Sequence, residues 1–117
     1  MAEKNETQLK RVLISAPHRS SGKSTVSIGL CAAWHRQGLQ VQSFKKGPDY
    51  IDPMWLTAAT GRDCSNLDFF IMGRQEILRT FGALSQGADL SLIEGNMGFF
   101  DGLDLGGGDS TAALSRL

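Results

Sequence analysis

The sequence predicts an α/β fold, in which helices flank a parallel sheet truncated to about three strands. Two observations carry this prediction. Apolar runs of strand length alternate with longer stretches of helical pattern, which is typical of parallel β-α-β units. The first run leads into a polar segment that ends in Gly-Lys-Ser and opens the first helical stretch. With 117 residues the chain forms at most one small domain.

The first half of the chain supplies a strand, a helix and a second strand. Residues 1–10 are polar and predict a disordered tail, whereas the branched apolar residues of 11–15 predict a strand buried on both faces. A helix is expected over 22–37, and Gly38 suits its C-terminal end. The alternating pattern of 39–44 predicts a second strand placed nearer the sheet edge.

The segment after the second strand is expected to be irregular. Residues 45–53 contain one glycine, two prolines and two aspartates, which disfavour regular structure. A loop that leaves the carboxyl end of a parallel strand lies at the ligand-binding edge of the sheet. A short helix over 54–60, ended by Gly61, follows, and 62–70 return as a loop or a short strand.

One more helix and one more strand complete the pattern. A helix is predicted over 73–85 and a third strand over 89–95, with Glu94 near its end. The residues expected on the apolar face of the helix are Ile77, Leu78, Phe81 and Leu84.

Composition argues against several classes of partner. Twelve basic and twelve acidic residues give a formal net charge of zero, so there is no basic excess for nucleic acid or an acidic membrane. No apolar run approaches the roughly 18 residues of a membrane span, and no signal peptide is recognised. A cytoplasmic protein is expected. Cys31 and Cys64 predict neither a disulfide nor a zinc site.

The polar segment before the first helix has the features of a phosphate-binding loop. Backbone N–H groups at a helix start can hold a polyphosphate, Lys23 would reach the β- and γ-phosphates, and Ser24 would bind Mg²⁺. The predicted nucleotide-binding residues here are Ser20, Ser21, Gly22, Lys23, Ser24 and Thr25. Only Gly-Lys-Ser matches the usual pattern, which expects glycine in place of Pro17, so a polar helix start remains the alternative. The fold expectation becomes a P-loop NTPase-like sheet.

Charged residues after the second and third strands form the other candidate site. Lys45, Lys46, Asp49 and Asp52 would suit an anionic substrate and a bound Mg²⁺, although a solvated turn explains their composition as well. Glu94 ends the strand expected beside the first one, where a carboxylate often orients Mg²⁺. Alternatively, Glu94 simply begins a loop.

Four stretches together indicate a family. They are Phe44-Lys45-Lys46-Gly47-Pro48-Asp49-Tyr50-Ile51-Asp52-Pro53, Asn66-Leu67-Asp68, Glu94-Gly95-Asn96-Met97-Gly98-Phe99-Phe100-Asp101-Gly102 and Asp109-Ser110-Thr111-Ala112. From 11 to 117 the chain resembles the N-terminal part of the cobyrinic acid a,c-diamide synthases, which are glutamine-dependent amidotransferases. In that family, and in the similar dethiobiotin synthetases, the first glycine of the phosphate loop falls at Ala16.

The resemblance implies a reaction and a set of residue roles. A carboxylate on an acetate side chain of a corrin-type tetrapyrrole attacks the γ-phosphate of ATP, and ammonia converts the resulting acyl phosphate to an amide. ATP and Mg²⁺ are the implied cofactors. The implied roles are catalysis for Lys23, Lys45, Lys46, Asp49 and Asp101, nucleotide binding for Ala16 and the loop residues above, substrate contact for Tyr50, Asp52 and Asn96, and metal binding for Ser24, Asp49 and Glu94.

The resemblance also implies missing parts. Family members are several times longer and end in a glutaminase domain, which supplies ammonia through a cysteine nucleophile and a histidine base. Cys31 and Cys64 do not lie in such a motif. The chain is therefore expected to be the front part of a synthetase domain, inactive alone. Cobyrinic acid, hydrogenobyrinic acid, and sirohydrochlorin- or sirohaem-type tetrapyrroles all remain open as substrates.

Two other functions are compatible with parts of the pattern. ATP-dependent switch proteins of the division or partition type resemble this fold, but they carry a second lysine at the position of His18 and lack the long Gly-Pro-Asp-Tyr-Ile-Asp-Pro loop. The other alternative is an inactive chain that forms homo-oligomers through the exposed edge of its first strand.

Overall fold

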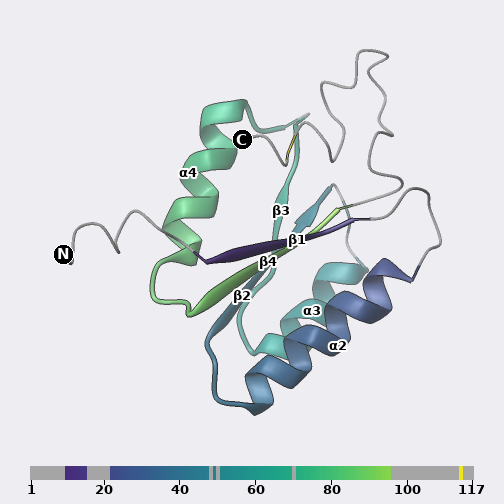
Figure 1. Ribbon diagram of the computed structural model, residues 1–117. Coiled ribbons are helices and arrows are strands. Elements are labelled where there is room, and N and C mark those ends of the chain that lie inside the picture. Colours follow the sequence, from purple (N-terminus) through teal and green to yellow (C-terminus); the bar gives the residue numbers. More distant parts are fainter. Residues whose placement is uncertain are drawn as a thin grey trace.

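The described residues form a parallel four-stranded sheet with helices on both faces (Figure 1). The computed structural model describes residues 10–15, 22–47, 49, 51–69, 71–95 and 114. The strands are β1 (Arg11–Ile14), β2 (Val41–Lys46), β3 (Ser65–Leu67) and β4 (Leu90–Glu94), and the helices are α2 (Lys23–Arg36), α3 (Asp52–Thr60) and α4 (Arg74–Ser85). The predicted α/β class is confirmed. The predicted tail, apart from Lys10, lies outside the described residues.

The order of the strands is β1-β4-β2-β3. The segment 62–70, predicted as a loop or a short strand, contributes β3, so the described sheet has four strands where about three were expected. β4 lies between β1 and β2 and pairs with both of them. The sheet thus brings together segments that are far apart in the sequence.

The predicted positions of the first two strands in the sheet are wrong: the first strand lies at an edge and the second lies in the interior. β1 is an edge strand among the described strands, and its apolar residues are only half-buried. β2 is an interior strand and all six of its residues are buried. Polar side chains do not place this strand at the edge, because Gln42 and Lys45 are buried with hydrogen-bond partners inside the fold. For example, Gln42 Nε2 donates to the carbonyl of Asp63 at 2.8 Å.

The segment predicted as irregular is ordered at both ends. β2 continues to Lys46 because its last residues pair with β4 and β3, so that Lys45 lies opposite Glu94 and Lys46 opposite Leu67. α3 begins at Asp52, with Pro53 in its first turn, where a missing N–H costs nothing. The irregular connection is therefore shorter than the sequence pattern indicates.

Helices cover both faces of the sheet (Figure 1), and each face has its own core. The core under α2 and α3 is formed by Cys31, Val41, Leu56 and Leu92. The core on the α4 side is formed by Phe44, Leu67, Ile77 and Leu114. Successive strand residues point to opposite faces, so neighbouring residues of β2 enter different cores.

The predicted apolar face of α4 is only partly correct. Ile77 is buried, and the Phe81 ring lies 5.0 Å from the Phe44 ring between centroids. Leu78 and Leu84, however, are 43% and 38% exposed. The sheet contacts a narrower stripe than predicted, and Ser85 takes the inward position through its hydroxyl contact with Ser91.

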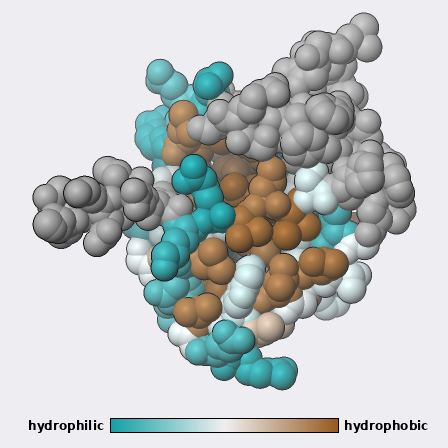
Figure 2. All heavy atoms as spheres, in the orientation of Figure 1, coloured by the Kyte–Doolittle hydropathy of each residue, from teal (hydrophilic) through white to brown (hydrophobic). Residues whose placement is uncertain are grey.

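The surface around β1 is apolar. Figure 2 shows hydrophobic side chains gathered over the middle of the face where Figure 1 draws β1, between α4 and α2. Within the described residues, no helix has the length and apolar character needed to cross a membrane.

Candidate functional site

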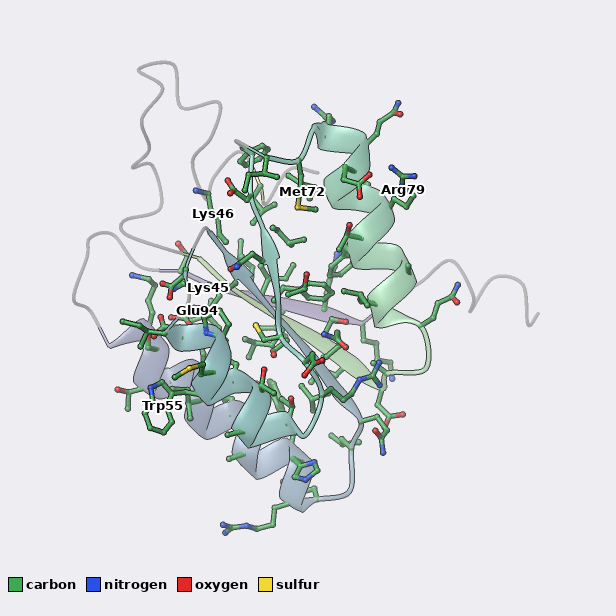
Figure 3. All side chains as sticks on the ribbon, turned by 180° about the vertical axis from the view of Figure 1, so that it is seen from behind. Lys45, Lys46, Trp55, Met72, Arg79 and Glu94 are labelled. Atoms are coloured by element: carbon green, nitrogen blue, oxygen red, sulfur yellow. The ribbon has the colours of Figure 1, made fainter. Side chains whose placement is uncertain are left out.

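The candidate site lies where β2 and β4 end and where α2 and α3 begin. Carboxyl ends of parallel strands meet at one edge of the sheet, and the register pairs Lys45 with Glu94 there. Figure 3 shows these two side chains together near the helix ends, with Lys46 apart from them. Ser24 from α2 and Asp52 from α3 complete the group. Ser24, Lys45, Asp52 and Glu94 are called the strand-end cluster below.

Lys45 is the centre of the strand-end cluster. Its Nζ lies 3.0 Å from Asp52 Oδ2 and 3.3 Å from Glu94 Oε2. It also donates to the backbone carbonyl of Gly95 at 3.2 Å, while Asp49 Oδ2 lies farther away, at 4.0 Å. Only 4% of the side chain is exposed, so these charge-assisted contacts are little screened by water.

Ser24 connects the start of α2 to the same two carboxylates. Its Oγ lies 2.8 Å from Asp52 Oδ2 and 2.7 Å from Glu94 Oε2. A hydroxyl carries one proton, so it donates to one carboxylate at a time. Asp52 Oδ2 and Glu94 Oε2 are also the oxygens nearest to the ammonium group of Lys45.

Glu94 has spare capacity to bind a further group. It is fully buried, and its Oε1 has no hydrogen-bond partner among the described residues, an arrangement that is costly unless something else binds there. Carboxylate and hydroxyl oxygens are preferred ligands of Mg²⁺. The described part of the chain has no group of three or more His, Cys, Asp or Glu that could hold a metal ion. A cation here would thus need the hydroxyl of Ser24 beside Asp52 and Glu94.

Asp52 is held in its charged form by its neighbours. Burial disfavours the carboxylate, but the hydrogen bonds from Ser24 and Lys45 and the positive charges of Lys45 and Lys23 outweigh burial, so the pKa of Asp52 lies below its ordinary value. At neutral pH this residue is therefore an anionic oxygen donor.

Asp49 and Asn66 hold the connection between β2 and α3. Asp49 Oδ1 accepts hydrogen bonds from the backbone N–H groups of Ile51 at 2.9 Å and Asp52 at 3.1 Å, which fixes the start of α3. Asn66 Nδ2 donates to the carbonyl of Asp49 at 3.1 Å. A Cβ at Gly47 would lie 2.6 Å from Asn66 Oδ1. Asn66 was not among the predicted site residues, although its Asn-Leu-Asp motif was the available signal.

The start of α2 has features that favour an anion. Gly22 precedes the helix with φ 84°, a left-handed conformation that favours glycine. No side chain caps this end among the described residues, and no acidic residue lies in the first turn. Lys23 is half-buried and Thr25 exposed. Uncapped N–H groups and the helix dipole favour negative charge at such an end.

The structure brings some of the sequence-predicted site residues together and not others. Ser24, Lys45, Asp52 and Glu94 meet, with Asp49 at the border of the cluster. Lys46 lies on the opposite face of β2, where its Nζ is 6.0 Å from the centre of the Phe69 ring. The predicted site residues outside the described residues are Ala16, Ser20, Ser21, Tyr50, Asn96 and Asp101.

The two cysteines are free thiols with little nucleophilic character. Burial, with contributions from Cys64 and Glu94, raises the pKa of Cys31 to about 12. Burial is also the main cause that raises the pKa of Cys64 to about 11. Because the thiolate is the reactive form, neither residue is suited to act as a nucleophile at neutral pH.

Comparison with known proteins agrees with the motifs. The chain is 57% identical over 93% of its length to a cobyrinate a,c-diamide synthase of Magnetococcus marinus and 47% identical over 91% to one of Synechocystis sp.. It is 48% identical over 80% of its length to a hydrogenobyrinate a,c-diamide synthase of Rhodobacter capsulatus. The chain spans less than a quarter of these relatives, 21–23% of their length. No family model and no solved structure matches it.

Proposed function

We propose that this chain, whose resemblance to the cobyrinic acid a,c-diamide synthases is confirmed by its relatives, is part of a ligase of cobalamin biosynthesis. The ligase would convert acetate side-chain carboxylates of a corrin-type tetrapyrrole to amides at the expense of ATP. The names of the relatives support the amidation. The observation that carries the proposal is the strand-end cluster, in which Lys45 lies between Asp52 and Glu94 beside the first turn of α2.

The phosphates of ATP would bind at the start of α2. Gly22 allows the backbone to turn there, and the first N–H groups of the helix lack a side-chain cap within the described residues. Lys23 follows directly and would contact the terminal phosphates. Bound ATP would supply the phosphoryl group that activates the substrate carboxylate.

Mg²⁺ would bind to Ser24, Asp52 and Glu94. These residues fit the ion because they offer hydroxyl and carboxylate oxygens and because Glu94 Oε1 is buried without a partner among the described residues. Bound Mg²⁺ would neutralise charge on the phosphates. From the sequence, Asp49 is expected as a metal ligand and Asp52 as a substrate contact. We propose Asp52 as the ligand instead, because Asp49 uses Oδ1 to hold the start of α3 and keeps Oδ2 toward Lys45.

Lys45 would guide the substrate carboxylate. In the proposed reaction a carboxylate oxygen attacks the γ-phosphorus and ADP leaves, after which ammonia displaces phosphate from the acyl phosphate. Such chemistry depends on positioning and charge neutralisation more than on a covalent catalyst. The side chain of Lys45 lies at the carboxyl ends of the strands, near the start of α2, whereas Lys46 points to the other face of the sheet. We therefore assign the steering role to Lys45.

The proposed reaction requires partners beyond this chain. Ammonia would come from glutamine through a glutaminase domain, as the resemblance implies. The substrate would be a tetrapyrrole of the cobyrinate or hydrogenobyrinate type, following the names of the relatives. ATP and glutamine are cytoplasmic metabolites, so the proposal places the protein in the cytoplasm.

Isothermal titration with a non-hydrolysable ATP analogue and Mg²⁺ tests the nucleotide site. The chain is expected to bind the analogue, and Lys23→Ala is expected to lose most of that binding. Arg36→Ala removes an exposed positive charge at the far end of α2 and should bind like the wild type. A folded wild-type sample that binds no analogue would overturn the proposed nucleotide site.

A further inference from the structure

We propose that Lys45 is a placeholder for the metal ion, and that arrival of the metal releases it toward Asp49 and the substrate. The inference rests on the proposed function and adds an order of events to it. Before the metal binds, the ammonium group occupies the position between Asp52 and Glu94. After the metal binds, the same ammonium group becomes available for an anionic substrate.

The first argument is that Lys45 and a metal would require the same atoms. Lys45 Nζ approaches Asp52 Oδ2 and Glu94 Oε2 at 3.0 and 3.3 Å, and these are the oxygens that also face Ser24. A Mg²⁺ ion needs its oxygen ligands at roughly 2.0–2.1 Å. A metal on these oxygens would repel the adjacent ammonium, so the two cations compete for one position.

The second argument is that Glu94 requires a cation at all times. Its side chain is fully buried, and a buried carboxylate without a cationic partner is strongly destabilising. Lys45 satisfies this need when no metal is present. It does so incompletely, because Lys45 brings a single positive charge into contact with the two carboxylates of Asp52 and Glu94, and Oε1 of Glu94 remains without a partner among the described residues. A divalent cation would balance both charges.

The third argument is that Lys45 has a second carboxylate within reach. Asp49 Oδ2 lies 4.0 Å from Nζ, and the backbone N–H groups that Asp49 binds use its other oxygen, Oδ1. The Asp49 side chain is 29% exposed, against 20% for Asp52 and none for Glu94. Movement of Nζ from Glu94 toward Asp49 therefore carries the ammonium from the buried end of the site toward its opening.

Binding of Mn²⁺ without nucleotide, followed through the electron paramagnetic resonance signal of the free ion, tests the competition. We expect Lys45→Met to bind Mn²⁺ at least about tenfold more tightly than the wild type, because a competing charge a few ångströms away is gone. Arg36→Met removes one exposed positive charge far from the cluster and should match the wild type. The double variant Lys45→Met with Glu94→Gln should lose this increase in Mn²⁺ affinity.

Amine labelling of the wild-type chain tests the movement without any substitution. Lys45 is 4% exposed, so an acylating reagent should modify it slowly, as quantified by peptide mass spectrometry. Saturating Mn²⁺ should increase its modification several-fold, while Lys10 should be unaffected. This measurement decides the question even if Lys45→Met does not fold.

The outcomes separate the two proposals. The proposal that Lys45 holds the place of the metal would be wrong if the wild type and folded Lys45→Met bound Mn²⁺ equally well. It would also be wrong if Mn²⁺ bound and left Lys45 protected from acylation. Neither result would contradict the proposed metal site. Absence of Mn²⁺ binding in the wild type and in Lys45→Met, with and without the ATP analogue, would overturn the metal site and the placeholder together.

Discussion

Lys45 and Glu94 occupy paired positions on the neighbouring parallel strands β2 and β4, and their charged atoms lie 3.3 Å apart on one face of the sheet. Backbone register therefore creates the central ion pair of the candidate site. A slip of one residue would turn one side chain to the other face. The ion pair of the candidate site therefore forms when β2 and β4 pair in this register.

Glu94→Gln should remove the metal dependence of nucleotide binding. The substitution keeps the size of the side chain but removes the charge that a divalent cation requires. We expect the Mg²⁺-dependent part of the affinity for a non-hydrolysable ATP analogue to fall at least about tenfold, as one lost charge-assisted contact implies. Calorimetric titrations with and without Mg²⁺ measure this. Glu76→Gln, on the exposed surface of α4, should leave both titrations unchanged.

Gly47→Ala should destabilise the fold. The added Cβ would lie 2.6 Å from Asn66 Oδ1 and 2.8 Å from the backbone nitrogen of Asp49, so the connection to α3 would have to shift. Overpacking of this kind costs about 1–3 kcal/mol, which urea unfolding would detect. The matched control is Gly82→Ala, because a Cβ there meets nothing within 4 Å and alanine favours a helix by about 1 kcal/mol. Equal stability of the two variants would contradict the close approach at Gly47.

Asp52 should make stability depend on pH in the acid range. Its pKa in the folded chain is below the ordinary value of 3.8, so the folded state binds this proton less readily than the unfolded state. Its contribution is fully present well above pH 3.8 and is lost as the pH falls through the lower, folded-state pKa. Urea unfolding of the wild type and Asp52→Asn over this range checks the sign. The stability difference between the two should shrink at low pH, and growth of that difference would contradict it.

The edge at β1 should promote association of the chain. Among the described strands β1 pairs on one side only, and apolar surface surrounds it (Figure 2). Unpaired strand edges of this kind add further strands. We expect the sedimentation coefficient to rise with concentration and Leu13→Lys to reduce that rise, because charged residues on an edge oppose pairing. A chain that stays monomeric at all concentrations would refute this prediction.

Local sequence patterns predicted the helices well. The helix expected over 22–37 is observed as Lys23–Arg36, and the one expected over 73–85 as Arg74–Ser85. Glycine marked the C-terminal ends of α2 and α3 in the sequence, and Gly38 and Gly61 do adopt left-handed conformations there. Such signals depend on a few neighbouring residues, so the ends of helices can be predicted from the local sequence.

The positions of the strands in the sheet could not be predicted in this way. Alternation of polar and apolar residues placed β2 near an edge, yet long-range pairing with β4 and β3 buries it. The separation of Lys45 from Lys46 follows from strand alternation once β2 is known to reach Lys46. The contact of Asp52 with Ser24 depends on where α3 begins, which in turn depends on Asp49.

The order of the strands also determines when the site can form during synthesis. β4 is the last described strand in the chain, but it lies between β1 and β2, which do not pair with each other. A ribosome therefore has to release the segment through Glu94 before the centre of the sheet can close. Contacts between such distant segments slow folding, and unpaired strands stay exposed meanwhile. Until β4 arrives, the edges of β1 and β2 that it will cover stay open to pairing with other chains.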